Sequence, residues 1–257
     1  CRACMVEIEG ERVLAASCMR KPSAGMVVNS ASSERAQTSR KMVMELLATD
    51  QPAREESPDK NSHFWKMAEL LAVDATEARF EASEKPCADN SSHAMRVNLQ
   101  SCINCNLCVR ACREVQVNDV IGMANRGGET KVVFDFDDPM GDSTCVTCGE
   151  CVQACPTGAL MPSAVTSEQG VGDSADYDRK VDSICQYCGV GCQLTYHVKD
   201  ERIIYVEGRD GPANQNRLCV KGRFGSDYIH HGDRITKPLV RIPGARKGIH
   251  DDFDPAK

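Results

Sequence analysis

Cysteine spacing limits what this chain can fold into more than any other feature of its sequence. Sixteen of the 257 residues are cysteine, which is far above ordinary usage. Cys87 stands alone, and the others fall into four groups. These groups are Cys1, Cys4 and Cys18; Cys102, Cys105, Cys108 and Cys112; Cys145, Cys148, Cys151 and Cys155; and Cys185, Cys188, Cys192 and Cys219. Such grouping predicts four sites at which several thiolates meet.

Disulfides, zinc sites and iron–sulfur clusters are the three explanations for such cysteines. Disulfides form in oxidising compartments and join separated partners, whereas these cysteines recur at every third position and converge on one point. Zinc sites use two well separated pairs. The two middle groups instead have the spacing C-x2-C-x2-C-x3-C, and Pro156 follows the second. This is the ferredoxin signature, so we predict iron–sulfur clusters.

The tandem arrangement also predicts which cysteines share a cluster. In tandem ferredoxin runs, the fourth cysteine of each run binds the other cluster. We therefore expect one [4Fe-4S] cluster on Cys102, Cys105, Cys108 and Cys155, a second on Cys145, Cys148, Cys151 and Cys112, and a third on Cys185, Cys188, Cys192 and Cys219. Arg113 departs from the pattern, since it stands where a proline follows the second run.

The first group contains three cysteines and is predicted to hold a [2Fe-2S] cluster. We expect the fourth ligand upstream of Cys1, so that the chain would begin inside this module. Alternating apolar and acidic residues predict a hairpin over residues 5–17, which would bring Cys4 and Cys18 to one cluster.

Hydrophobic patterning predicts a mixture of short helices and strands. Ser32 or Ser33 can cap a helix from Glu34 to about Ala48, whose expected apolar face holds Val43, Leu46 and Leu47. A second helix is expected over 64–73, a strand over 26–28, and strand pairs over 120–123 with 131–136 and 193–198 with 202–207. The expected divisions are a [2Fe-2S] module (1–48), a helical connector (49–93), a double [4Fe-4S] module (94–162), a polar linker (163–180) and a last cluster-binding segment (181–257).

Composition excludes several classes of protein. The formal net charge is −6, which argues against a nucleic-acid binder, since that class shows a basic face. No apolar run is long enough to predict a membrane span. Aromatic residues make up only 5% of the chain, so the clusters are expected to replace part of a hydrophobic core and folding is expected to need metal.

Two stretches of the last segment resemble a known family. Cys185-Gln-Tyr-Cys188-Gly-Val-Gly-Cys192 and Arg217-Leu-Cys219-Val-Lys221-Gly-Arg223 resemble the start of the molybdopterin oxidoreductase domain. The order of modules, together with residues 104–116 and 207–214, is similar to the alpha subunit of soluble NAD-linked formate dehydrogenases.

The resemblance implies a fold and a set of cofactors. The fold would be α+β and modular: a β-grasp [2Fe-2S] ferredoxin module, a double [4Fe-4S] ferredoxin module and the start of a molybdopterin oxidoreductase domain. Such subunits hold molybdenum or tungsten on two pterin guanine dinucleotides and oxidise formate to carbon dioxide. The metal ligand and its partners would lie downstream of Lys257, so no catalytic residue is expected here. Lys221 would lie between the last cluster and one pterin.

The resemblance also implies partners and a cellular location. Flavin- and NAD-binding subunits with further iron–sulfur clusters would accept the electrons, and the enzyme would be cytoplasmic. Relatives often carry an H-x3-C-x2-C-x5-C cluster between the first two modules. Starting from His63 or His93, the required positions hold no cysteine, so we expect that cluster to be absent and Cys87 to be a free thiol.

Two alternative functions are compatible with the sequence. One is another molybdopterin oxidoreductase, similar to assimilatory nitrate reductase, which shares the Cys-Gly-Val-Gly-Cys motif. The other is a polyferredoxin that only carries electrons.

Overall fold

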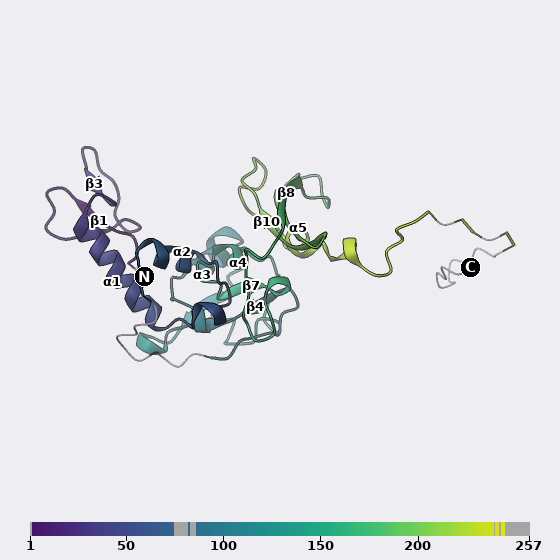
Figure 1. The fold of residues 1–257 in the computed structure, drawn as a ribbon, viewed down its shortest axis with the longest axis horizontal. Helices are drawn as coiled ribbons and strands as arrows, with labels where there is room; N and C mark the ends of the chain where they lie inside the picture. Colours follow the sequence, from purple (N-terminus) through teal and green to yellow (C-terminus); the bar gives the residue numbers. More distant parts are fainter. Residues whose placement is uncertain (1, 75–81, 83–85, 239, 242, 245–257) are drawn as a thin grey trace.

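The structure is a computed structural model that describes all residues except 1, 75–81, 83–85, 239, 242 and 245–257. Small sheets and helices follow one another along the chain, with the N-terminal strands at one side of the folded part, the last sheet at the other, and the C-terminal stretch extending beyond that sheet (Figure 1). The strands are β1 (Met5–Ile8), β2 (Ala15–Ala16), β3 (Val28–Asn29), β4 (Met95–Val97), β5 (Ile121–Ala124), β6 (Lys131–Phe134), β7 (Leu160–Pro162), β8 (Arg179–Ile184), β9 (Gln193–Lys199) and β10 (Arg202–Gly208). The α-helices are α1 (Glu34–Thr49), α2 (His63–Leu70), α3 (Leu107–Arg110), α4 (Glu150–Ala154) and α5 (Val220–Phe224).

The N-terminal part contains the predicted hairpin. β1 pairs antiparallel with β2, with Met5 opposite Ala16, and with β3 on its other side. Val6 and Ile8 are buried, as their alternation with glutamates predicts. The side chain of Ser33 accepts a hydrogen bond from the Ala36 amide and caps α1.

The buried face of α1 differs from the prediction. Leu46 was expected to face the core, but 54% of its surface is exposed. The buried residues are Ala36, Met44 and Ala48, and the last two form one core cluster with Phe64 and Trp65 of α2. Of the expected apolar face, Leu47 packs partly buried against this core and only Leu46 is exposed, so tertiary packing settles the orientation of a weakly amphipathic helix.

The central part holds both ferredoxin runs between two paired strands. β4 pairs antiparallel with β7, so the chain entering the first run lies beside the chain leaving the second. The 32 residues between the runs form the predicted strand pair, in which β5 pairs with β6. The core includes Met95, Ile121 and Leu160 together with Cys108, Cys112 and Cys151, so cysteines are core residues of this part.

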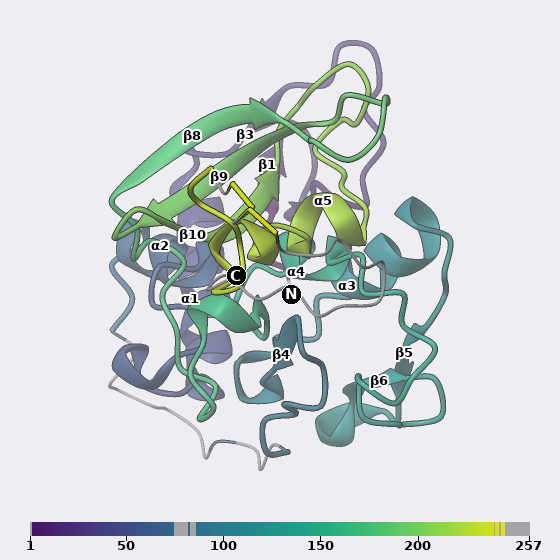
Figure 2. The same ribbon diagram turned by 90° about the vertical axis from the view of Figure 1, so that its right-hand side faces the viewer.

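The last part is a sheet in the order β10-β9-β8. β9 and β10 form the predicted hairpin, and β8 pairs along its whole length with β9. Figure 2 shows α5 between this sheet and helices α3 and α4. The stretch before β8 packs on the earlier modules: the Gly172 amide donates to the Ser57 carbonyl, and the Asn98 side chain donates to the Gly170 carbonyl.

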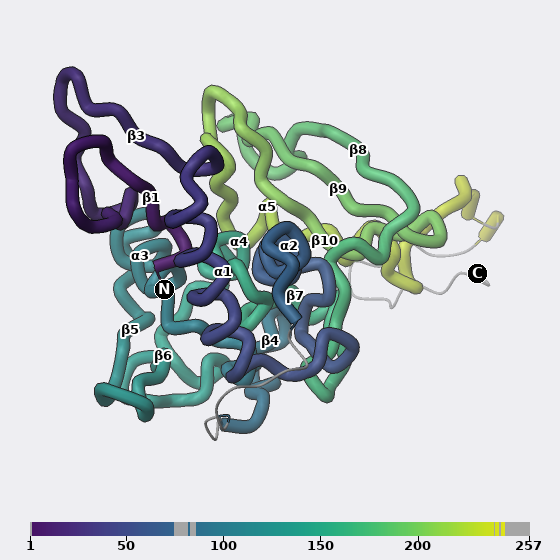
Figure 3. The backbone as a smooth tube through the Cα atoms, turned by 60° about the vertical axis from the view of Figure 1, so that its left-hand side comes forward, coloured from purple at the N-terminus to yellow at the C-terminus, as the bar shows by residue number. Residues whose placement is uncertain are grey.

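Helices α1 and α2 lie between the N-terminal strands and the last sheet, as Figure 3 shows. No helix in the described part of the chain is both long and apolar enough to cross a membrane.

Candidate iron–sulfur sites

Site 2, as we name the predicted set Cys102, Cys105, Cys108 and Cys155, is assembled from both ferredoxin runs. The four cysteines line one cavity together with Leu99 and Pro156. Cys155 comes from the second run, and it reaches the cavity because β7, which follows it, pairs with β4 just before the first run. The crossed arrangement expected from the tandem motif is thus the arrangement that the fold produces.

Site 3 is the matching set Cys145, Cys148, Cys151 and Cys112. Burial raises the pKa of Cys145, a hydrogen bond from the Thr147 amide lowers it, and the charge of Cys112 raises it further. Cys112 is buried beside this set, and its sulfur accepts a hydrogen bond from the Val120 amide at 3.4 Å. The structure therefore brings together the four cysteines that were predicted for each of these two sites.

The two ferredoxin loops share one backbone geometry. Asn104 and Thr147, each two residues after the first cysteine, have positive φ values of 51° and 55°. Asn106 and Gly149, four residues after it, have φ values of 66° and 76°. Asparagine and glycine tolerate this left-handed region better than other residues, whereas threonine is strained there. The repeated turn directs three thiols of each run toward one point.

The same turn places an amide beside a thiol in each loop. The Asn104 amide donates to Sγ of Cys102 at 3.5 Å, and the Thr147 amide donates to Sγ of Cys145 at 3.4 Å. Hydrogen bonds to ligand sulfurs help to set the reduction potential of a bound cluster. Sequence reasoning did not single out Asn104 or Thr147, although their identical position in the two runs was a signal for a shared role.

Several buried cysteines in each of the two sites resist ionisation when no cation is present. Burial, followed by the charges of Cys155, Cys102 and Cys105, raises the pKa of Cys108 to about 12. Burial and the neighbouring thiols also raise the pKa of Cys151 well above its ordinary value. Buried thiolates need a compensating positive charge, and a cluster of iron ions supplies it. The donor set therefore fits an iron–sulfur cluster.

The spacing of these thiols differs from that of a single-ion site. Within the described residues, no group of three or more His, Cys, Asp or Glu side chains is arranged to hold one metal ion. Thiols that surround several irons enclose a larger volume than thiols that bind one ion, so the finding is compatible with sites that each bind a cluster.

Site 4 comprises Cys185, Cys188, Cys192 and Cys219. The Cys185 amide donates to the Cys192 carbonyl at 2.8 Å, where β8 ends and β9 begins. Burial and then the charges of Cys185, Cys188 and Cys219 raise the pKa of Cys192. Cys219 precedes α5 as its N-cap residue, and β10 has returned the chain to this point, as the hairpin predicts.

Site 1 comprises Cys1, Cys4 and Cys18. The hairpin of β1 and β2 brings Sγ of Cys4 and Sγ of Cys18 to 3.3 Å. Cys1 lies outside the described residues. Ala3 of this loop and Ile103 of the site 2 loop both pack against the core formed by Met44, Phe64 and Trp65, so α2 connects sites 1 and 2 through apolar contacts.

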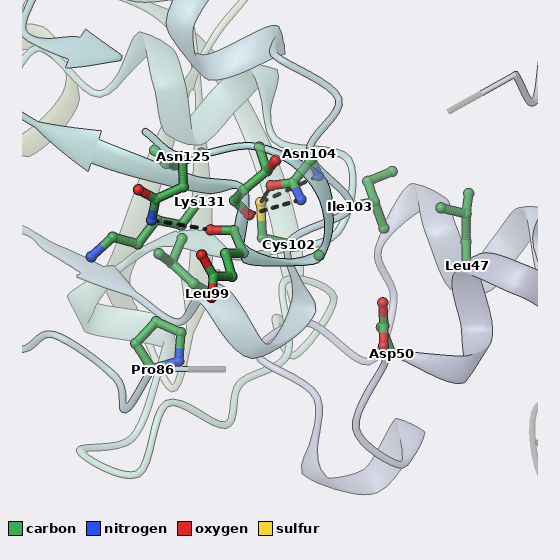
Figure 4. Close-up of a pocket in the computed structure, with 13 residues that line it drawn as sticks. Leu47, Asp50, Pro86, Leu99, Cys102, Ile103, Asn104, Asn125 and Lys131 are labelled. Carbon is green, nitrogen blue, oxygen red and sulfur yellow. Dashed lines mark hydrogen bonds between the residues drawn. The ribbon is translucent and has the colours of Figure 1, made fainter. Parts of the chain in front are cut away.

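Site 2 also borders an open cavity. The cavity has a volume of about 630 Å³ and lies between Leu47 and Asp50 at the end of α1 and Lys131 of β6. Figure 4 shows Cys102, Ile103 and Asn104 on its wall. Site 2 is therefore reachable from the side of the molecule that carries α1.

The two remaining predicted residues lie at the surface. Lys221 is exposed on α5, two residues after Cys219. Cys87 is exposed and belongs to none of the four sets.

Comparison with known proteins divides the chain into three domains. Residues 1–33 match a 2Fe-2S iron–sulfur cluster binding domain, residues 101–159 a 4Fe-4S dicluster domain, and residues 178–231 a molybdopterin oxidoreductase Fe4S4 domain. The predicted fold class and the order of its modules are confirmed.

The curated relatives are larger proteins. The chain is 32% identical over 248 residues to a subunit of an NADH-quinone oxidoreductase from Rhizobium meliloti, covering 95% of this chain and 28% of the relative. It is 28% identical over 280 residues to a protein of Staphylococcus haemolyticus named provisionally as a formate dehydrogenase, again covering 95% and 28%. The chain thus spans little more than a quarter of these relatives.

One solved structure is similar in fold. A crystal structure of an NAD+-reducing [NiFe]-hydrogenase in the H2-reduced state matches with a TM-score of 0.55 and 25% sequence identity. The match covers 67% of this chain and 74% of that chain.

Proposed function

We propose that this chain, which matches the molybdopterin oxidoreductase Fe4S4 domain and carries two further iron–sulfur domains before it, is the electron-transfer part of a formate dehydrogenase. Electrons from formate would pass through three [4Fe-4S] clusters and one [2Fe-2S] cluster toward NAD. The observation that supports this most is that the cysteines of sites 2, 3 and 4, and Cys4 with Cys18 of site 1, gather in one chain of consecutive, mutually packed modules. Such a series of clusters serves electron conduction.

The residues of the chain would hold and tune these clusters. When bound, the clusters accept and release single electrons. The cysteines of sites 2, 3 and 4 bind them, and the amides of Asn104, Thr147 and Val120 stabilise negative charge on the ligand sulfurs. Ala3 and Ile103 both pack against the apolar core that contains Trp65, so this core would lie between the clusters of sites 1 and 2.

The assignment to formate rests on two observations. The Fe4S4 domain at residues 178–231 belongs to molybdopterin oxidoreductases, and several relatives are named as formate dehydrogenases. In the complete enzyme, molybdenum or tungsten on two pterin guanine dinucleotides would be held by further sequence, and partner subunits would bind flavin and NAD.

The test is an assay of the full-length complex with formate and NAD. We expect reduction of NAD that depends on formate, together with stoichiometric molybdenum or tungsten. If a complex that contains the metal reduced its clusters with another substrate and not with formate, that substrate would replace formate in this proposal.

A second candidate is an electron-transfer subunit of an NADH-oxidising complex without a working pterin site. The relative from an NADH-quinone oxidoreductase and the NAD+-reducing hydrogenase support it. In that case NADH would reduce the clusters, formate would not, and molybdenum and tungsten would be absent.

The first prediction concerns the iron content. Anaerobic reconstitution of this chain should give about 12 irons per chain, three cubanes of four, with a weak or absent [2Fe-2S] signal because site 1 contributes three cysteines. Iron, acid-labile sulfide and zinc analysis checks this. Stoichiometric zinc with little sulfide would contradict the cluster assignment.

The second prediction concerns Lys221. If this exposed lysine faces a pterin in the complete enzyme, Lys221→Ala should lower formate turnover about 10-fold, the scale on which outer-shell residues act, at normal iron content. Lys221→Arg should retain part of the activity because the charge persists. Lys41→Ala on α1 is the control. Full turnover in a Lys221→Ala enzyme that carries its clusters would show that Lys221 is only a solvated surface residue.

A further inference from the structure

A buried ion pair connects the domain that contains site 3 with the domain that contains site 4. Glu150 begins α4 immediately before Cys151, and Arg223 lies in α5, four residues after Cys219. Nη2 of Arg223 lies 2.6 Å from Oε1 of Glu150, and the two side chains are 3% and 8% exposed. Charged side chains are rarely buried to this extent, because desolvation offsets most of what the pair gains.

Each partner of the pair also binds backbone next to a site. Nε of Arg223 donates to the carbonyl of Cys148 at 2.9 Å, so the guanidinium contacts a residue of site 3 directly. Oε1 of Glu150 accepts from the Leu218 amide at 3.0 Å, and Leu218 is bonded to Cys219 of site 4. A continuous series of covalent and hydrogen bonds therefore runs from Cys148 through Arg223 and Glu150 to Cys219.

The surroundings fix this arrangement. Gln153 of α4 accepts from Nη1 of Arg223 at 2.8 Å and donates to the Asn216 carbonyl at 2.8 Å. Gly149 has a φ of +76°, and a Cβ there would fall 2.2 Å from Cδ of Arg223. Glycine between Cys148 and Glu150 is thus needed both for the turn and for the close approach of the arginine.

We propose that Arg223 and Glu150 are positioning residues that form the bridge through which sites 3 and 4 exchange electrons. The inference rests on the proposed electron-transfer function. In each event, one electron leaves a reduced cluster at one site and enters an oxidised cluster at the other. No covalent bond forms or breaks, and no proton transfer is required. Bonded paths couple two redox centres more strongly than gaps between packed atoms, which gives a buried charged pair a use that an apolar contact lacks.

The experiment uses the full chain, loaded with clusters and reduced by a flash-generated flavin radical as the one-electron donor. The informative variant is the double substitution Glu150→Leu/Arg223→Met. Replacing a buried ion pair by apolar residues is often neutral for stability, so the interface should persist while the hydrogen bonds to the Cys148 carbonyl and the Leu218 amide are lost. Arg223→Lys keeps the charge but not the geometry of two parallel donors. Arg179→Lys, in the exposed pair with Glu201, is the matched control.

Four quantities are measured: iron content, thermal unfolding, the magnetic coupling between the two reduced clusters, and the rate at which they equilibrate. We expect the double variant to keep the iron content, the thermal unfolding and the magnetic coupling of the parent. Its clusters should equilibrate about 10-fold more slowly, which is the scale of outer-shell effects. Arg223→Lys should be intermediate, and the control should match the parent.

Two results would overturn the bridge. One is a parent-like rate in the loaded double variant, or in Arg223→Lys should the double variant fail to load. The other is a slower rate together with weaker magnetic coupling, which would show that the spacing of the clusters changed. Because the reductant is artificial, a complex that does not oxidise formate leaves this test unaffected.

Discussion

Replacing Cys112 with serine should remove the cluster of the other ferredoxin run and leave the cluster of its own run in place. Cys112 lies in the first run, but the fold places its thiol with Cys145, Cys148 and Cys151. We therefore expect Cys112→Ser to lose about four irons from site 3. Electron paramagnetic resonance of the reduced protein, with iron analysis, measures which cluster is lost.

Cys155→Ser is the reciprocal variant. Its thiol belongs with Cys102, Cys105 and Cys108, so this substitution should empty site 2 and retain site 3. Cys87→Ser, at an exposed cysteine outside the four sets, should change neither. If Cys112→Ser emptied site 2 and spared site 3, the crossed pairing would be wrong.

Much of this pairing could be predicted from spacing, because the tandem repeat of one motif assigns the fourth cysteine of each run to the cluster of the other run. The same holds for the hairpin of β1 and β2, where alternation places Val6 and Ile8 on one face, and for the hairpin of β9 and β10. For the hairpins the information lies within a few neighbouring residues, and for the cysteines it lies in a repeated motif, so the sequence alone is sufficient.

Features that depend on contacts between distant residues were not predictable in this way. The burial of Met44 and Ala48 of α1 depends on Phe64 and Trp65, which follow the helix in sequence. β8 begins inside the stretch that was predicted to be a polar linker. Its composition does not indicate a strand, and the hydrogen bonds that form this strand come from its pairing with β9. Arg223 stands inside the motif that identified Lys221, but its contact with Glu150 spans 73 residues, and no local pattern reports such a pair.

Removing iron should unfold the central part of the chain before the last sheet. The central core contains Cys108, Cys112 and Cys151 among its buried residues, and these thiols would be left facing one another without a cation. Where a metal site forms only on folding, its binding energy is part of the folding energy. We expect the amides of β4 and β7 to exchange about 100-fold faster or more after chelation, which corresponds to roughly 3 kcal/mol of lost protection.

The sheet of β8, β9 and β10 is the internal control for this loss. Its core of Leu194, Val206 and Leu218 contains no fully buried cysteine, and Cys185 and Cys192 of site 4 pack only partly buried against it. His197 of β9 stacks on Tyr205 of β10 with ring centroids 3.9 Å apart, and it is hydrogen-bonded to Glu207 at 2.8 Å. These contacts hold β9 and β10 together without metal. Hydrogen exchange followed by mass spectrometry, with and without an iron chelator, should therefore show protection retained in β9 and β10. Equal loss of protection in both parts would mean that the folding of the whole chain depends on its clusters. Unchanged protection in β4 and β7 would mean that the central core is stable without metal and that the clusters do not replace it.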